Sequence, residues 1–352
     1  MGKAGKMARQ RAGEKAEEQV LRIIDANINR SMEGLRVVDE IVRFILNDEP
    51  LTAKVKGLRH LLQKGIRPIG DDFYLYRESA GDVGRRLYPE SEGARAGVQE
   101  VFGANIKRAE EAVRCLEEFS KLIKPAYGRT FKEARFQLYD LEKEIIPRLV
   151  KAIKLDFDLY VVTDPALDHL KVARQTLAAG VKMIQPRDKK ISKEEYLRLA
   201  KKIAVLAKRA GATFILNDYW DLVEEVGADG VHLGQEDLAK LTVKKVREKI
   251  GEDKIIGVST HSLEQATAAA KAGADYISCG PIFITPSKPL GKPVGLKLLK
   301  KVLKAVQIPV VAIGGIDESN YQEIIKAGGQ RFAAIRSSEV LAQALNLSRM
   351  AP

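Results

Sequence analysis

The fold of this chain is decided by a pattern that is clearest in residues 213–237, TFILNDYWDLVEEVGADGVHLGQED. This stretch holds two short apolar runs, and polar residues follow each of them. Short runs of this kind that alternate with helix-length segments are typical of parallel β/α units. From Asp158 onward we find eight such runs, which are Leu159 to Val162, Val181 to Ile184, Thr213 to Leu216, Gly230 to Leu233, Lys254 to Val258, Tyr276 to Cys279, Pro309 to Ile313 and Arg331 to Ile335.

Eight β/α units in about 195 residues predict a compact (β/α)8 TIM barrel, so the expected fold class is α/β. A doubly wound open sheet is the alternative. It is disfavoured because Thr163-Asp164-Pro165 follows the first run, where a dinucleotide-binding sheet would carry a GxGxxG motif. We therefore expect a TIM-barrel domain over residues 151–352.

The preceding residues, 14–150, show apolar side chains at helical spacing almost throughout. Between Leu35 and Ile45, for example, apolar residues recur at steps of three and four. Gly, Pro and Asp interrupt the pattern near residues 48–50, 65–72, 81–93 and 124–125. We expect an all-α N-terminal domain ahead of the barrel.

This helical half contains an internal repeat. Ala26-Asn27-Ile28-Asn29-Arg30 recurs 78 residues later as Ala104-Asn105-Ile106-Lys107-Arg108. Such self-similarity predicts two helices related by a pseudo-two-fold axis. Two interpretations stay open for their shared polar side, a paired anion site and solvated faces with ion pairs between neighbouring turns. The candidate residues are Asn27, Arg30, Glu33, Arg36, Asn105, Arg108, Glu111 and Arg114.

Composition limits the classes of function. The chain has 352 residues, with 59 Lys and Arg against 47 Asp and Glu, a formal net charge of +12. Part of the excess belongs to residues 1–13, for which we expect a basic flexible tail. Aromatic residues make up only 6%, too few for the stacking surfaces that bind single strands, so we expect no nucleic-acid partner. No apolar stretch is long enough for a membrane span, Cys115 and Cys279 lack metal-ligand spacing, and no secretory signal is present. We therefore expect a cytoplasmic protein with no membrane partner.

Polar residues follow most of the runs, at the barrel end where TIM barrels gather their chemistry. Arg187, Lys189 and Lys288 supply cations there. The turn Gly314-Gly315 and the segment after Ile335 offer backbone N–H groups to an anion, and loops in these two positions frequently bind phosphate. The sequence thus predicts a site for phosphorylated small molecules.

Two carboxylates, Asp218 and Asp237, follow neighbouring runs. Carboxylate oxygens suit a Mg²⁺ ion that also binds substrate phosphates. The alternative interpretation is one helix cap and one salt bridge. Because a diphosphate that faced two carboxylates without a metal would be repelled, the paired acids beside basic residues predict a polyphosphate bridged by Mg²⁺.

The chain shows no clear general base or nucleophile. His232 and Cys279 lie within expected strands, and we expect His261 to orient a loop. A reaction whose difficult step is the departure of diphosphate needs neither group, because catalysis then consists of charge stabilisation and positioning.

Over about residues 156–345 the strand ends resemble those of thiamine-phosphate synthases. The resemblance rests on seven motifs in order, which are Gln185-Pro186-Arg187-Asp188-Lys189, Leu216-Asn217-Asp218, residues 227–237, Gly257-Val258-Ser259-Thr260-His261, Gly280-Pro281-Ile282-Phe283, Thr285-Pro286-Ser287-Lys288 and Ile313-Gly314-Gly315-Ile316. It implies that 4-amino-2-methyl-5-(diphosphooxymethyl)pyrimidine and thiazole phosphate are joined to give thiamine phosphate and diphosphate. It also implies a dissociative substitution assisted by Mg²⁺ on Asp218 and Asp237.

The resemblance assigns further residues to the two substrates. The pyrimidine diphosphate would contact Gln185, Pro186, Arg187, Asp188, Lys189, Asn217, Ser259 and Lys288, of which Arg187, Lys189, Ser259 and Lys288 would be catalytic. The thiazole phosphate would contact Thr285, Pro286, Ser287, Gly315, Ile335 and Arg336. This chain departs from the family pattern at Pro186, which lacks a backbone N–H, and at Arg336, where the family more often has Ser. The alternative function is a catalytically silent barrel that binds thiamine or thiazole phosphate as a regulator.

The N-terminal half resembles the helical extension of long forms of this synthase, through Ala26–Arg30, Glu33–Arg36 and Gly81-Asp82-Val83-Gly84. One hypothesis is a kinase that acts on hydroxymethylpyrimidine phosphate, although the segment has no Walker-type loop. The other hypothesis is a module for channelling or for dimerisation, which would make the protein a homo-oligomer through its helical domain.

Overall fold

The structure, a computed structural model, describes residues 3–77, 82, 94–285 and 292–350. The chain divides into two compact units, Met1–Val150 and Lys151–Pro352. Among the described residues the first unit is helical, and all described strands belong to the second. The predicted fold class, a helical part followed by an α/β part, is therefore confirmed.

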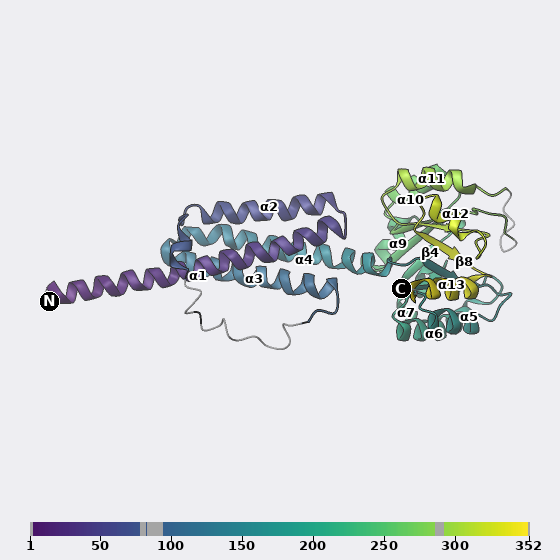
Figure 1. Ribbon diagram of the computed structural model, residues 1–352, viewed down its shortest axis with the longest axis horizontal. Coiled ribbons are helices and arrows are strands. Elements are labelled where there is room, and N and C mark those ends of the chain that lie inside the picture. Colours follow the sequence, from purple (N-terminus) through teal and green to yellow (C-terminus); the bar gives the residue numbers. More distant parts are fainter. Residues whose placement is uncertain (1–2, 78–81, 83–93, 286–291, 351–352) are drawn as a thin grey trace. The chain divides into compact units, whose positions relative to one another are not determined.

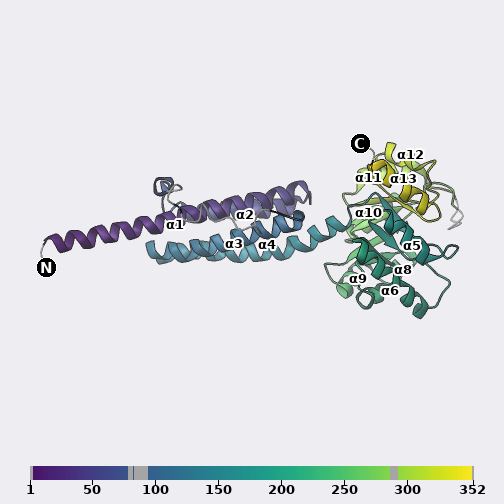
Figure 2. The ribbon, with the colours of Figure 1, turned by 60° about the horizontal axis from the view of Figure 1, so that its bottom comes forward.

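The long helices of the first unit follow the repeat of the sequence and lie side by side (Figure 2). They are α1 (Lys3–Phe44), α2 (Glu49–Ile66), α3 (Val98–Ile123) and α4 (Gly128–Lys154), with the 3-10 helices η1 (Phe73–Tyr76) and η4 (Pro125–Tyr127). Helix α1 ends at Phe44 and α3 at Ile123, while α2 begins at Glu49 and α4 at Gly128. These helix ends thus recur at nearly the spacing of the sequence repeat. Helices α1 and α2 form one helical hairpin, and α3 and α4 form the second.

Helices α1 and α3 approach each other closely at Gly34. A Cβ atom on Gly34 would lie 2.7 Å from the carbonyl oxygen of Asn105 and 3.4 Å from the Cβ of Ala109. Only glycine permits this approach, because any side chain would overlap the opposite backbone. The two copies of the repeat therefore pack against one another, above a core that includes Leu35 and Phe102.

Helix α1 begins at Lys3, so residues 3–13, which we expected in a flexible tail, are helical. The reason is local, because Ala, Lys, Arg, Gln and Met in this segment all have high helix propensity. Neither α1 nor any other helix in the described part of the chain combines the length and the apolar character that crossing a membrane requires.

The second unit is a closed barrel of parallel strands in chain order, in which β1 pairs with both β2 and β8. The strands are β1 (Leu159–Val162), β2 (Met183–Gln185), β3 (Thr213–Asn217), β4 (Gly230–Leu233), β5 (Ile255–Thr260), β6 (Tyr276–Cys279), β7 (Val310–Ile313) and β8 (Arg331–Ala334). The helices that surround them (Figure 1) are α5 (His169–Ala178), α6 (Lys193–Ala210), η5 (Trp220–Leu222), α7 (Val223–Val226), α8 (Gln235–Leu238), α9 (Val243–Ile250), α10 (Leu263–Lys271), α11 (Gly295–Ala305), α12 (Tyr321–Lys326) and α13 (Ser338–Met350). The TIM barrel predicted from the eight runs is confirmed.

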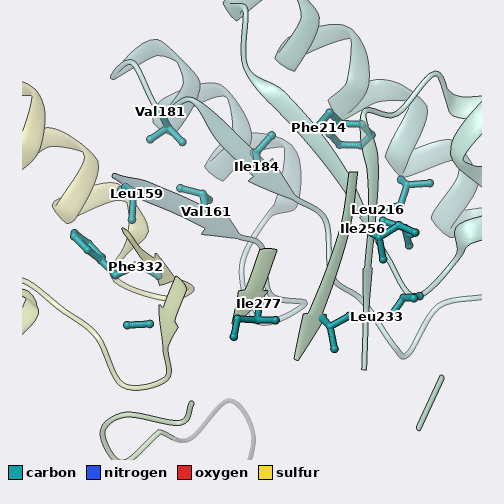
Figure 3. Close-up of a cluster of buried hydrophobic side chains, with 14 of the residues drawn as sticks. Leu159, Val161, Val181, Ile184, Phe214, Leu216, Leu233, Ile256, Ile277 and Phe332 are labelled. Atoms are coloured by element: carbon teal, nitrogen blue, oxygen red, sulfur yellow. The ribbon is translucent and has the colours of Figure 1, made fainter. Parts of the chain in front are cut away.

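Alternate strand residues face two different layers. In β1, Val161 packs into the apolar layer between strands and helices, whereas Tyr160 and Val162 face the barrel interior. Figure 3 shows the outer layer, with Ile184 and Phe214 among its labelled side chains. Because both faces of each strand are buried, the strands appear in the sequence as continuous apolar runs.

Several strands extend further than their apolar runs. Gln185 and Asn217 are the last residues of β2 and β3, and Ser259 lies within β5, although the sequence places all three after the strands. Their backbones remain paired, since the Gln185 carbonyl accepts from Thr163 N at 2.9 Å and Ser259 pairs with Ser278 of β6. Polar side chains at these ends interrupt the apolar pattern but leave the strand intact. These side chains are consequently held by the rigid sheet.

Candidate active site at the carboxyl end of the barrel

The carboxyl ends of the strands surround a cavity of about 920 Å³, counted with its open mouth. Residues from all eight strands or the positions that directly follow them contribute to its wall. Among the predicted site residues, the cavity is lined by Gln185, Arg187, Lys189, Asn217, Asp218, Ser259, Thr285 and Ile335. Barrel closure therefore brings together these predicted residues from four of the seven motifs, which are far apart in the sequence, and Ile335 after β8.

Two cations of the cavity wall lie on the loop after β2. The backbone N–H of Arg187 donates to Thr163 Oγ1 at 3.4 Å, which ties this loop to the end of β1. Lys189 Nζ lies 3.1 Å from Asp218 Oδ2. An arginine and a lysine at the same edge of a cavity suit an anion with several oxygens, such as a phosphate ester.

Asp218, directly after β3, has a left-handed backbone conformation with φ 63°. Residues other than glycine rarely adopt this conformation, and it tends to occur at functional positions. The turn is held on both sides, because Asp218 N donates to the His232 carbonyl and the Asp218 carbonyl accepts from Trp220 N, both at 2.9 Å. The backbone, and not a flexible loop, thus determines where this carboxylate lies.

Asp237 lies in α8, where its Oδ2 accepts from Gly234 N at 2.8 Å. Burial raises the pKa of Asp237, the Gly234 N–H opposes this effect, and the neighbouring Asp218 carboxylate raises the pKa further. The pair therefore includes one helix cap and one salt bridge, as the alternative interpretation held. The two carboxylates nevertheless repel each other, and a divalent cation would relieve this repulsion.

The donor set of this pair fits Mg²⁺ better than a metal held by protein ligands alone. In the described part of the chain, no group of three or more His, Cys, Asp or Glu residues is placed to hold a metal ion. Mg²⁺ commonly binds to one or two carboxylates and completes its shell with water and substrate phosphates. Two neighbouring carboxylates, of which Asp218 lines the cavity, match that arrangement.

Two residues of the β2 motif lie away from the cavity. The Pro186 carbonyl accepts from the buried Tyr196 hydroxyl at 3.0 Å. Asp188 is buried, accepts from Lys190 N at 2.9 Å and lies 3.3 Å from His169 Nε2. Both residues shape the loop that carries Arg187, and neither is among the residues that line the cavity.

The opposite side of the cavity is formed by the ends of β6, β7 and β8. Gly314 has φ +100°, and a Cβ atom there would lie 2.6 Å from the Cα of Pro281. Gly314 and Ile335 line the cavity, whereas the neighbouring Gly315 and Arg336 do not. Thr285 lines it as well, while the predicted residues Pro286, Ser287 and Lys288 lie outside the described residues.

Polar residues within the strands also line the cavity, and the sequence pattern did not predict them as site residues. Tyr160, His232 and Ser278 line the cavity although they precede the strand ends. The missing signal is strand alternation, which would have placed these residues on the inner face of the barrel once its closure was known.

Cys279 and His261, a potential nucleophile and a potential base, both have structural roles. Burial raises the pKa of Cys279 to about 12, so its thiol stays protonated at neutral pH. His261 lines the cavity, but its ring Nδ1 lies 2.6 Å from the Gly280 carbonyl oxygen, and its backbone N–H donates to Gln265 Oε1 at 2.7 Å. These contacts agree with the loop-orienting role expected for His261.

The repeated residues of the helical unit show matching local contacts. Asn27 Nδ2 donates to the Ile23 carbonyl and Asn105 Nδ2 to the Val101 carbonyl, each at 2.8 Å. The repeated Arg and Glu candidates are all exposed. They are Arg30, Glu33, Arg36, Arg108, Glu111 and Arg114. Arg36 pairs with Glu40 at 2.6 Å and Arg114 with Glu118 at 2.9 Å, one turn further in each helix. The second copy thus reproduces the ion pair of the first. Of the motif Gly81–Gly84, only Asp82 is among the described residues.

Two family models match the chain, one for each unit. The model described as thiamine monophosphate synthase matches residues 159–337, which include every strand of the barrel. The ThiD2 family model matches residues 22–144 of the helical unit.

Similar proteins extend over both units. A thiamine-phosphate synthase of Nostoc punctiforme is 38% identical over 324 residues, covering 92% of this chain and 91% of the relative. Another from Synechocystis is 39% identical over 319 residues, covering 90% of this chain and 91% of the relative. The solved structure of thiamine phosphate pyrophosphorylase from Pyrococcus furiosus has 32% identity and a TM-score of 0.50, and it covers 56% of this chain and 100% of its own. The barrel, the order of its site motifs and these matches agree, and the chain belongs to the thiamine monophosphate synthase family of transferases, in a long form with a helical unit before the barrel.

Proposed function

We propose that the barrel joins 4-amino-2-methyl-5-(diphosphooxymethyl)pyrimidine to thiazole phosphate and forms thiamine phosphate and diphosphate. The observation that carries the proposal is one cavity that gathers Arg187, Lys189 and Asp218 on one side and Gly314 and Ile335 on the other. Two anion-binding edges around a single cavity suit two phosphorylated substrates. The names of the relatives, which are thiamine-phosphate synthases, support this assignment.

In the proposed reaction the side chains of the β2 and β3 ends bind the pyrimidine diphosphate. The C–O bond to the diphosphate breaks, and its electron pair leaves with the diphosphate. Arg187 and Lys189 stabilise the negative charge that develops on the leaving oxygens. The thiazole nitrogen then uses its lone pair to form the new C–N bond to the methylene carbon. No protein base is required, because the nitrogen carries no proton before the bond forms.

Asp218 and Asp237 would hold Mg²⁺, which supplies positive charge to the leaving diphosphate when it is bound. Lys189 lies beside Asp218 and would add a second contact to the same oxygens. Gln185, Asn217 and Ser259 line the same cavity. Their hydrogen-bonding groups would orient the pyrimidine ring. Pro186 and Asp188 would contribute indirectly, through the loop conformation.

The thiazole phosphate would lie against Thr285, the Gly314-Gly315 turn and the residues after β8. Gly314 has a positive φ, and Pro281 fills the space that a side chain there would need, so glycine is required for this turn at the cavity wall. Pro286, Ser287 and Lys288 remain assigned to the site by family resemblance. Arg336 follows Ile335 directly, and its charge would favour the phosphate from outside the cavity wall.

The full chain is expected to release diphosphate from the two substrates only in the presence of Mg²⁺. The metal requirement follows from the repulsion between the substrate diphosphate and the two carboxylates. A coupled assay for diphosphate, with thiamine phosphate measured by chromatography, tests this with and without a chelator. Saturable binding of thiamine phosphate with no turnover would instead support the regulator that we kept as the alternative.

We further propose that the helical unit acts on hydroxymethylpyrimidine phosphate and supplies the barrel with its diphosphate. The separate match of this unit to the ThiD2 family supports an activity of its own. The repeat places two equal sets of Arg and Glu on the packed pair α1 and α3. Channelling, or a homo-oligomer formed through this unit, is the other proposal. The reactants are small phosphorylated molecules, and we place the reaction in the cytoplasm without nucleic acid or a membrane.

A full chain with a disabled barrel is expected to convert hydroxymethylpyrimidine phosphate and ATP into the diphosphate, which then accumulates. The Asp218→Asn variant serves for this purpose, because its helical unit is unchanged. Chromatography of the pyrimidine products provides the measurement, and a sample without ATP provides the control. Absence of ADP and of the pyrimidine diphosphate would exclude the kinase and leave channelling or oligomerisation.

A further inference from the structure

A chain of polar side chains crosses the barrel interior and joins five strands. It runs through Gln185, Tyr160, Tyr276, His232 and Ser259. Gln185 Nε2 donates to Tyr160 Oη, and the hydroxyl oxygens of the two tyrosines lie 3.1 Å apart. The Tyr276 hydroxyl also lies 2.9 Å from His232 Nδ1, and His232 Nε2 lies 2.9 Å from Ser259 Oγ. Tyr276 is the one member of this set that does not line the cavity.

Gly257 makes the central part of this chain possible. In the sheet register it lies between His232 of β4 and Tyr276 of β6. A Cβ atom on Gly257 would lie 2.1 Å from Tyr276 Cζ and 2.4 Å from its hydroxyl oxygen. The tyrosine ring therefore occupies the space above the glycine and reaches a histidine two strands away. Their ring centroids lie 5.5 Å apart.

The distances are compatible with two opposite orders of protons, and only one of them gives the buried Tyr160 hydroxyl an acceptor within this set of residues. In that order the Gln185 amide donates to Tyr160, the Tyr160 hydroxyl donates to Tyr276 and the Tyr276 hydroxyl donates to His232 Nδ1. His232 is then neutral, and its proton lies on Nε2, which donates to Ser259 Oγ. The hydroxyl proton of Ser259 is left to donate into the cavity. Burial raises the pKa of both Tyr160 and Tyr276, so both stay protonated donors at neutral pH.

We propose that Tyr276 is a positioning residue of the transferase, because its hydroxyl holds His232 in the Nε2–H tautomer and so makes Ser259 a hydrogen-bond donor toward the pyrimidine diphosphate. This inference rests on the proposed function of the barrel. Tyr276 acts through its neighbours alone, since it does not line the cavity. Without its hydroxyl, His232 can carry the proton on Nδ1, and Ser259 would then donate to the unprotonated Nε2 and not to the substrate.

The Tyr276→Phe variant tests the inference by steady-state kinetics. We expect kcat/KM for the pyrimidine diphosphate to fall about fivefold, since one hydrogen bond contributes about 1 kcal/mol and a tenfold change would need about 1.4 kcal/mol. The KM for thiazole phosphate stays unchanged. In a Ser259→Ala background the same substitution lowers kcat/KM less than about twofold, because the group through which Tyr276 acts is already absent. Losses that multiply in the double variant would show that Tyr276 acts independently of Ser259 and would overturn the inference.

Nitrogen NMR gives a readout that does not depend on turnover. The chain has 4 histidines, so ¹⁵N-histidine spectra are simple, and a His232→Gln variant assigns the signals. In the wild-type protein the His232 Nε2 signal is expected to be that of a protonated nitrogen and the Nδ1 signal that of an unprotonated one. The two shifts move toward each other in Tyr276→Phe. They stay unchanged in Tyr160→Phe, which also lacks one hydroxyl but keeps the bond between Tyr276 and His232.

These outcomes separate the inference from the function on which it rests. A wild-type chain that forms no thiamine phosphate overturns the function. A wild-type chain with full activity whose His232 carries its proton on Nδ1 overturns only the role of Tyr276, even if the Tyr276→Phe protein does not fold. Unchanged ¹⁵N shifts of His232 in a folded Tyr276→Phe protein would likewise overturn only the role of Tyr276.

Discussion

The Asp218→Asn substitution is expected to lower kcat for thiamine phosphate formation about a thousandfold, a loss of about 4 kcal/mol of transition-state stabilisation. The carboxylate lies in a left-handed turn at the cavity wall, beside Lys189 and near Asp237. Asparagine tolerates the same backbone conformation, so the turn survives while the charge is lost. Diphosphate release, measured at increasing Mg²⁺ concentration, should show a lower maximum rate and a higher Mg²⁺ requirement.

Asp221→Asn provides the matched control for this variant. Asp221 lies close to Asp218 in the chain, but it forms an ion pair with Lys193 on the surface and does not line the cavity. Its removal should leave kcat and the Mg²⁺ requirement within about twofold, because an exposed ion pair contributes little. An Asp218→Asn enzyme with normal kcat and a normal Mg²⁺ profile would refute the metal assignment.

The Arg187→Gln substitution is expected to lower kcat/KM for the pyrimidine diphosphate about a hundredfold, equivalent to about 2.7 kcal/mol. Arg187 lines the cavity on the loop that Thr163 Oγ1 fixes. Its guanidinium would contact the diphosphate most strongly as the C–O bond breaks and negative charge develops. We therefore expect the larger part of the loss in kcat rather than in KM. Initial rates at varied concentrations of each substrate separate the two parameters.

Arg198→Gln is the control here, since it removes the same group from an exposed position on α6. It should leave both kinetic parameters unchanged. If Arg187→Gln raised only the KM for thiazole phosphate, Arg187 would belong to the other substrate, and the assignment of the two cavity edges would have to be reversed.

Much of the site was predictable because strand order and motif order coincide. Parallel strands all end at one rim of a closed barrel, so Arg187, Asp218 and Thr285 meet there whatever the details of packing. Whether the residues next to these in the chain line the cavity or are buried in the loop was not predictable in this way. Asp188 lies next to Arg187 in the chain, yet it is buried against His169. Its carboxylate accepts from the backbone N–H of Lys190 and so stabilises the loop that carries Arg187.

The helical unit gives a similar contrast. The repeat around Asn27 and Asn105 predicted two related helices, and helix ends near the same spacing agree with it. The close approach at Gly34 is visible only in the packed pair, because a glycine in a helical pattern is by itself compatible with many roles. The positive charge of residues 3–13 suggested a flexible tail, but the segment extends α1 because its residues have high helix propensity.

The sequence by itself determined the fold class, the eight β/α units, the repeated helices and the residues that follow the strands, because all of these depend on local spacing along the chain. Only the tertiary structure decided which inward side chains touch. His232, Gly257 and Tyr276 come from three strands, and their contact exists because barrel closure places them in one row and the glycine leaves room for the ring. Side-chain contacts of that kind depend on register and closure, which no local pattern encodes.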